Sequence, residues 1–189
     1  SVNGQEDQFT KNDRKVLKLM LEAYERKHEP FGGTTRHRAF LWGPSAVYYT
    51  DFPTWVQNCW GINILVEMES LNFTKPLETE DKEEALRDLA RLYERMVMRR
   101  HTNGGYQNVV DELWRQCEAW NTNIIIMYQN VACKNMATVQ GILDEQGRER
   151  GYDLIWVEHD LMDPRTVSRR TMRDKVNEYM LSLIHISEP

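Results

Sequence analysis

The chain has 189 residues, of which 24 are Lys or Arg and 29 are Asp or Glu, so its formal net charge is −5. A composition of 41% hydrophobic and 28% charged residues is typical of a globular domain and excludes a disordered tail. No apolar run approaches the roughly 20 residues of a membrane-spanning helix, and mild acidity argues against a nucleic-acid binder. Three widely spaced cysteines form no disulfide framework, so we expect a cytoplasmic protein.

The two ends of the sequence differ from its centre. Residues 1–35 predict an amphipathic helix over 12–28 and a linker, and we expect this segment to be left from a preceding domain. The last helix is predicted to end near Met180. Residues 181–189 do not continue its pattern and resemble the translation of a sequencing adaptor, so we expect a non-native tail. A frayed natural terminus is the alternative.

Residues 36–180 alternate strands with helices, and we expect them to form one α/β domain. In chain order, the predicted elements are a strand ending at Trp42, a helix over 52–60, a strand over 62–68, a helix over 77–98, a helix after Gly105, a strand over 123–128, a helix from Cys133 to Gly151, a strand over 152–157 and a helix that begins at Ser168. This alternation predicts a doubly wound, mainly parallel four-stranded sheet of the flavodoxin or Rossmann-like type.

The carboxyl ends of the predicted strands are the expected place for a site, because ligands of open parallel sheets gather there. Four segments are predicted to meet at this edge of the sheet: residues 43–45, 69–72, 129–134 and 158–165. The sequence contains neither a GxGxxG nor a GxxxxGK[ST] motif, and it lacks CxxC pairs and HExxH. General motifs therefore do not identify the chemistry.

Cys133 lies just after a buried strand and at the start of a helix, with Lys134 beside it. The helix N-terminus and the neighbouring ammonium group both favour the thiolate, which is the form that a nucleophile or an iron ligand needs. A small cysteine packed under the strand end is an equally good interpretation. Cys117 falls on the apolar face of its helix, and Cys59 lies at a helix end, so we expect both to be structural.

Three carboxylates and one guanidinium lie within eight residues, at Glu158, Asp160, Asp163 and Arg165. One interpretation is a site for a cation or for an activated proton. The interpretation that we favour is loop architecture, with a turn at Asp163 and with Arg165 paired to a neighbouring acid. In an extended strand His159 points opposite to Glu158 and Asp160, so no metal triad is predicted.

The segments 128–135 and 158–168 together resemble the 2-hydroxyacyl-CoA dehydratase and benzoyl-CoA reductase subunit family. Its members place a Cys-Lys or Cys-Arg pair after an apolar strand, as at Cys133. An acidic strand end of the form E-x-D-x-x-D-x-R follows further along the chain. A helix rich in arginine and aromatic residues comes next, here with Arg173 and Tyr179.

This resemblance covers residues 36–180 and implies the second domain of a two-domain subunit, with a 4Fe–4S cluster held between the domains. Cys133 is similar to the cluster ligand that the second domain supplies, so the other ligands would come from a first domain absent from this sequence. The resemblance also implies a homologous second subunit, an ATP-hydrolysing iron–sulfur activator and an acyl-CoA or aromatic-CoA substrate. The sequence around Cys133 and Asp160 leans towards the benzoyl-CoA reductase type.

We therefore expect a fragment of an iron–sulfur subunit of an oxygen-sensitive enzyme, which uses low-potential electrons to reduce or dehydrate a CoA thioester. The fragment alone is expected to be inactive, and no catalytic or substrate-binding residue is predicted in it. One alternative is a non-catalytic electron-relay subunit of the same family. Another is a cluster-free α/β ligand-binding domain, in which replacing Cys133 by Ser leaves function unchanged.

Overall fold

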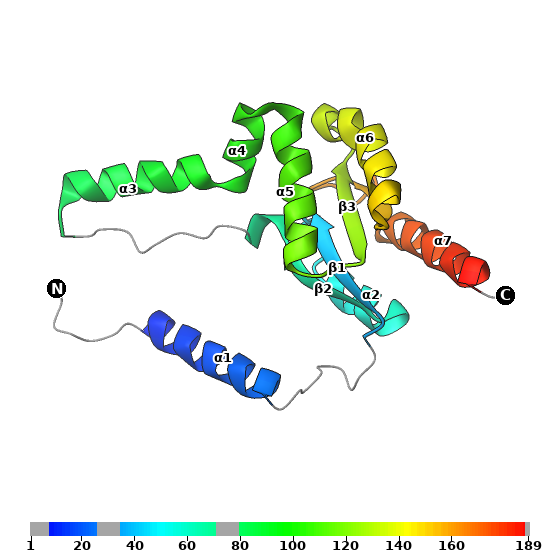
Figure 1. Cartoon of the computed structure of the whole chain (residues 1–189), viewed down its shortest axis with the longest axis horizontal. Helices are drawn as coiled ribbons and strands as arrows, with labels where there is room; N and C mark the ends of the chain where they lie inside the picture. The colour runs from blue at the N-terminus through cyan, green and yellow to red at the C-terminus, as the bar shows by residue number, and fades with distance from the viewer. Residues whose placement is uncertain (1–7, 26–34, 71–79, 188–189) are drawn as a thin grey trace.

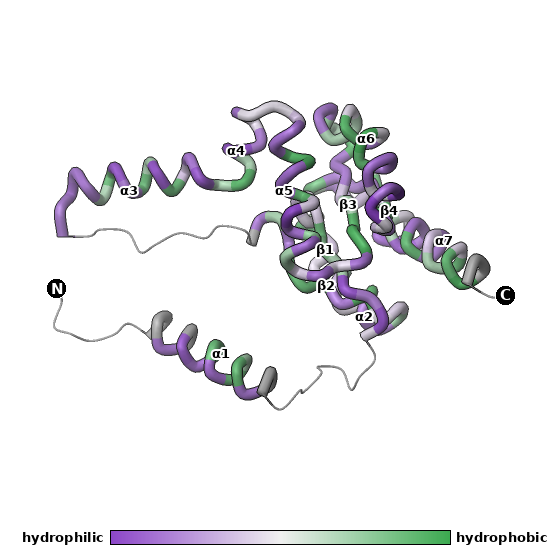
Figure 2. Tube along the Cα trace, viewed as in Figure 1, coloured by the Kyte–Doolittle hydropathy of each residue, from purple (hydrophilic) through white to green (hydrophobic). Residues whose placement is uncertain are grey.

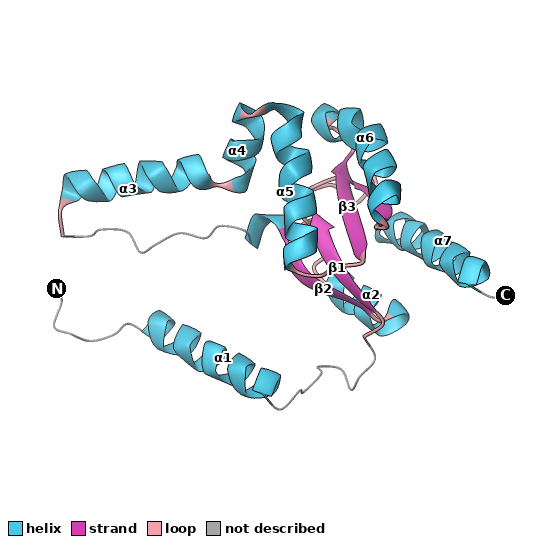
Figure 3. Ribbon diagram, in the orientation of Figure 1, coloured by secondary structure: helices cyan, strands magenta, loops and turns pink. Residues whose placement is uncertain are grey.

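A four-stranded parallel sheet lies at the centre of the computed structural model, which describes residues 8–25, 35–70 and 80–187 (Figures 1 and 3). The strands run in the order β2-β1-β3-β4, and every pairing is parallel. This order confirms the predicted doubly wound α/β fold. The bounds of the strands are β1 (His37–Trp42), β2 (Ile62–Glu67), β3 (Ile124–Asn130) and β4 (Asp153–His159).

Helices cover both faces of the sheet. One face carries α2 (Phe52–Trp60) and α7 (Arg169–Ser187). The other carries α4 (Val97–Asn103), α5 (Gly105–Ala119) and α6 (Lys134–Arg150). The remaining described elements are α1 (Gln8–Glu25), the short 3-10 helix η2 (Met68–Ser70) and α3 (Lys82–Arg95). Figure 1 shows α1 and α3 standing apart from the sheet.

The strands are apolar on both faces because both faces are covered. In β3 the side chains of Ile124, Ile126 and Tyr128 are buried towards α2 and α7. Those of Ile125 and Met127 are buried towards α5 and α6. In Figure 2 the first part of β3 is green, the colour of hydrophobic residues, and its carboxyl end is not. Because its side chains enter both cores, β3 joins them. Burial of one such aliphatic side chain contributes about 1.5–3 kcal/mol to the stability of the fold.

The predicted ends of several helices are confirmed. Gly61 closes α2 with a φ of 66°, and Gly151 closes α6 with a φ of 76°. These are left-handed conformations that glycine adopts without a steric penalty. Ser168 precedes α7, and its hydroxyl accepts a hydrogen bond from the Thr171 N–H at 3.1 Å. No helix in the described ranges is long and apolar enough to cross a bilayer.

Three predicted helices differ from the structure. The predicted helix over 77–98 is two helices, because Met96 takes an extended ψ of 140° between α3 and α4. The prediction that the last helix ends near Met180 was wrong, since α7 continues to Ser187 and Leu183 packs against the core below it. The predicted first helix over 12–28 is already helical at Gln8, and residues 26–28 of the prediction lie outside the described residues.

Candidate functional site at the carboxyl edge of the sheet

The strand order places a topological switch point between β1 and β3. From β1 the chain goes to β2 at one side, and from β3 it goes to β4 at the other. In open α/β sheets, ligands bind outside the carboxyl ends of the strands at such a point. The segments that follow these two central strands begin at Gly43 and at Val131. They are therefore the first place where this fold can build a site.

Gly43 brings the end of β1 against the backbone of β3. Its φ is 109°, and a Cβ atom built on it would lie 2.3 Å from the carbonyl oxygen of Tyr128. Only glycine allows both this dihedral angle and this close approach. Because backbone meets backbone here, the two strand ends at the switch point are fixed relative to each other.

A tight turn after β3 presents Cys133. The Asn130 side-chain oxygen accepts the Ala132 N–H, and the Asn130 carbonyl accepts the Cys133 N–H, both at 2.8 Å. The turn is joined to β4 because the Val131 N–H donates to the His159 carbonyl at 2.9 Å. Cys133 is the N-cap residue of α6, its sulfur caps no backbone N–H, and its side chain is half-buried. Backbone hydrogen bonds thus fix the place of Cys133 at the carboxyl edge.

The other two cysteines lie elsewhere. Cys117 is fully buried in the core under α5, and burial raises the pKa of its thiol to about 12, which confirms the structural prediction. Cys59 is exposed on α2, so core packing does not account for it. Across the described ranges, no three His, Cys, Asp or Glu side chains gather into a group that could hold a metal ion.

The acidic segment after β4 is a hydrogen-bonded loop. The Asp160 carboxylate accepts the N–H groups of Met162 and Asp163 at 2.9 and 2.8 Å, and these bonds lower its pKa. The Asp163 carboxylate accepts the Arg165 guanidinium, with an Nη2–Oδ2 distance of 2.7 Å, which lowers the pKa of Asp163. Glu158 points to solvent. These bonds agree with the loop-architecture interpretation and leave the carboxylates to shape the edge of the site.

His159 points inward, opposite to Glu158, as predicted. Its ring is fully buried and lies 5.0 Å from the Tyr128 ring, measured between centroids. Neither imidazole nitrogen has a hydrogen-bond partner of normal geometry among the described residues, and the Tyr128 hydroxyl has none there either. Burial lowers the pKa of His159 and raises that of Tyr128, so both side chains are neutral near pH 7. Two neutral polar groups therefore lie directly beneath the carboxyl edge.

Comparison with known families places this edge in context. Residues 5–180 match the family described as 2-hydroxyglutaryl-CoA dehydratase, D-component. The chain belongs to this dehydratase family. The match includes all four strands, Cys133 and the acidic loop. It confirms the dehydratase side of the predicted resemblance and does not confirm the lean towards benzoyl-CoA reductase. A search of curated proteins finds no match.

For this member of the dehydratase family, the three cysteines decide whether the chain alone fits a 4Fe–4S cluster. Such clusters are usually held by four cysteine thiolates. The structure places only Cys133 at the switch point, while Cys117 faces the core and Cys59 lies on α2. The described residues therefore do not fit a complete cluster. This chain can offer one thiolate at the edge.

Sequence reasoning missed His101 of α4. Its ring stacks on Trp42 at the end of β1, with 5.3 Å between ring centroids, and its buried Nε2 atom has no hydrogen-bond partner within the described part of the chain. Burial lowers the pKa of His101, and the nearby Glu112 carboxylate opposes the shift. The only signal in the sequence was its position shortly before Gly104, which marked a helix end. The contact with Trp42 is tertiary and has no local pattern.

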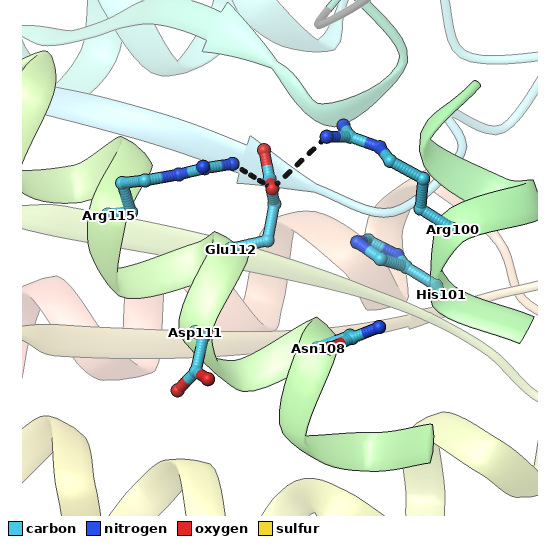
Figure 4. Close-up of a pocket in the computed structure, with 6 residues that line it drawn as sticks. All are labelled: Arg100, His101, Asn108, Asp111, Glu112 and Arg115. Carbon is cyan, nitrogen blue, oxygen red and sulfur yellow. Dashed lines mark hydrogen bonds and ion pairs between the residues drawn. The ribbon is translucent and has the colours of Figure 1, made fainter. Parts of the chain in front are cut away.

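His101 of this dehydratase-family chain adjoins two cavities. One of about 270 Å3 lies between α4 and α5, where Glu112 pairs with Arg115 and, at 3.5 Å, with Arg100 (Figure 4). The other, of about 290 Å3, reaches Asn135 in the first turn of α6, two residues from the switch-point cysteine. The edge that carries Cys133 is therefore hollowed on the α5 side.

Proposed function

We propose that this chain is part of a 2-hydroxyacyl-CoA dehydratase-type subunit in which Cys133 supplies one thiolate to a 4Fe–4S cluster. The observation that carries the proposal is the place of Cys133 at the switch point, within a match to a dehydratase component family. The description of the family favours dehydration of a CoA thioester over reduction of benzoyl-CoA. The reductase and electron-relay interpretations stay predictions.

Two features of the chain suit Cys133 to this role. The hydrogen bonds of the Asn130 turn fix the backbone of Cys133, so the place of its Cβ atom at the edge is set before any ligand binds. Its side chain is half-buried, which leaves the sulfur open to groups supplied from outside this chain.

The remaining ligands and reactants come from other molecules or domains in this proposal. A component family implies a partner subunit in the dehydratase complex. We propose that the other cluster ligands come from a first domain, that an ATP-hydrolysing iron–sulfur activator supplies the electron, and that the substrate is an acyl-CoA thioester. The isolated 189-residue chain is then inactive, because it provides one thiolate only.

The test uses the complete subunit that contains this chain, expressed anaerobically with its partner subunit. Iron and acid-labile sulfide are measured in the wild type, in Cys133→Ser and in the matched control Cys59→Ser. We expect about four of each per subunit in the wild type and in the control, and their loss in Cys133→Ser. An iron-free wild type, or a Cys133→Ser variant that keeps its iron, contradicts the proposal.

The reaction type is tested separately with the activator, ATP and two substrates. Formation of an enoyl-CoA from a 2-hydroxyacyl-CoA is the expected result. Consumption of benzoyl-CoA without any dehydration contradicts the dehydratase assignment, whatever the iron content is. The two measurements therefore separate the cluster from the chemistry.

A further inference from the structure

A groove of about 720 Å3 lies between α2 and α7, on the face of the sheet opposite to α5 and α6. The described residues that line it include three arginines of α7, at positions 169, 170 and 173, and one carboxylate, Asp174. The lining therefore carries two net positive charges on a chain whose formal net charge is −5. A basic groove on an acidic protein attracts anions locally while the rest of the chain repels them.

The arginines of this groove differ in how firmly they are held. The Arg173 guanidinium lies 5.3 Å from the ring centroid of Tyr49 and 5.2 Å from that of Trp55, and its Nε donates to the Tyr49 hydroxyl. A guanidinium fixed in this way loses little conformational freedom when it binds an anion. The Arg170 side chain is 91% exposed, and its Nε lies 3.8 Å from the Asp174 carboxylate. Its terminal nitrogens are open to a ligand.

Aromatic side chains line the same groove. Trp55 and Trp60 are half-buried there, and the Trp60 indole is fixed because its Nε1 donates to the Asn177 side-chain oxygen at 2.9 Å. Indole faces stack on nucleobases, and arginine forks bind phosphate oxygens in pairs. A volume of about 720 Å3 is within the range of ligand-binding pockets. Arginines alone suit a simple anion, whereas arginines with indoles suit a phosphorylated base.

We propose that the groove between α2 and α7 binds a phosphorylated adenine nucleotide, with the base on the indole side and the phosphates on the arginines of α7. The choice of adenine rests on the proposed function, because a CoA thioester carries a 3′-phosphorylated ADP group. Free ADP is the other ligand that offers an adenine base with phosphates. α7 begins at Arg169, directly after the loop that follows β4, so the groove starts beside the carboxyl edge.

The binding test uses the iron-free 189-residue chain and follows its tryptophan fluorescence during titration with CoA, dephospho-CoA, ADP and pyrophosphate. The variant is Arg170→Glu, at a side chain that is 91% exposed and pairs with Asp174. The matched control is Arg87→Glu on α3, whose guanidinium likewise pairs with a carboxylate of its own helix, Glu84, at 2.7 Å. Since the chain carries no cluster here, failure of this test and failure of the iron test are distinguishable.

We expect CoA and ADP to bind more tightly than pyrophosphate, with affinity falling as salt rises. Arg170→Glu is expected to weaken binding about tenfold, because it replaces a cation beside the phosphates by an anion. Arg87→Glu, which makes the same change of charge far from the groove, is expected to leave binding unchanged. Preference for CoA over dephospho-CoA and ADP supports the thioester as the source, and equal binding supports a free nucleotide. Pyrophosphate binding as tightly as ADP, absence of binding, or an Arg170→Glu variant that binds normally overturns the proposal.

Discussion

The imidazole of His159 is buried beside Tyr128, and in the ranges that the structure describes neither of its nitrogens has a hydrogen-bond partner of normal geometry. Burial lowers its pKa below the ordinary value of 6.5, and the backbone groups of Asp160 and Pro44 together with the Asp160 carboxylate only partly oppose this shift. The unfolded chain thus takes up a proton near pH 6.5 that the folded chain resists. By linkage, the stabilising contribution of the neutral ring is complete above that pH and is lost as the pH falls below it.

We therefore expect the free energy of unfolding to fall between about pH 7 and about pH 5, and His159→Phe to make this fall shallower. Urea unfolding at several pH values measures the slope in both proteins. Part of the slope persists in the variant because burial also lowers the pKa of His37 and of His101. Identical slopes in the wild type and in His159→Phe contradict the assignment of a buried neutral imidazole.

Individual elements show how far the sequence alone leads. The continuous apolar run of β3 predicts a strand covered on both faces, and the glycine that ends α6 predicts its boundary, because both are local signals. The break at Met96 was not predicted, since its extended backbone follows no glycine or proline. The length of α7 was not predicted either, because Leu183 is held by packing against the sheet.

The sequence likewise predicts one part of the candidate site and not the other. Cys133 and the loop after β4 follow strands that the sequence predicts, so their position at one edge of the sheet follows from the topology. The β2-β1-β3-β4 order itself, which sets the switch point beside Cys133, depends on long-range pairing. The same is true of the groove between α2 and α7, whose arginines and indoles are more than a hundred residues apart, as the Trp60–Asn177 bond illustrates.

The caps of α7 and α3 should differ in their effect on stability. Ser168 begins a helix whose Met172, Val176 and Met180 are buried, so Ser168→Ala is expected to lower the free energy of unfolding by about 1 kcal/mol. Asp81 accepts the Glu84 N–H at 2.8 Å at the start of α3, a helix with no described apolar side chain in either core. Asp81→Ala is expected to speed amide exchange in α3 and to leave the urea midpoint unchanged.

These two variants serve as controls for each other. Urea unfolding followed by tryptophan fluorescence reports the two cores, and hydrogen exchange reports α3 separately. A shift of the urea midpoint in Asp81→Ala as large as that in Ser168→Ala contradicts the arrangement in which α3 lies apart from the cores.

At the scale of the whole molecule, both cores are built from the sheet and the helices between residues 39 and 180. The described apolar side chains of α1, among them Val16 and Met20, are more than half exposed. We therefore expect removal of residues 1–34 to change the melting temperature by less than about 2 °C. Circular dichroism on heating measures this change.

Removal of residues 181–189 is the matched comparison at the other end. Because Leu183 packs against the α2 and α7 core, we expect this shorter deletion to lower the melting temperature measurably. A chain without residues 1–34 that loses its cooperative transition contradicts the assignment of both cores to the central residues.

The position of β1 in the middle of the sheet has a consequence for biosynthesis. Ala39 lies opposite Ile64 on one side and opposite Ile124 on the other. The β1 and β2 strands leave the ribosome close together, but β3, the second partner of β1, emerges only after η2, α3, α4 and α5 have been made. Until then one apolar edge of β1 is open to pairing with other chains. The two central strands, β1 and β3, can therefore pair only once β3 has left the ribosome.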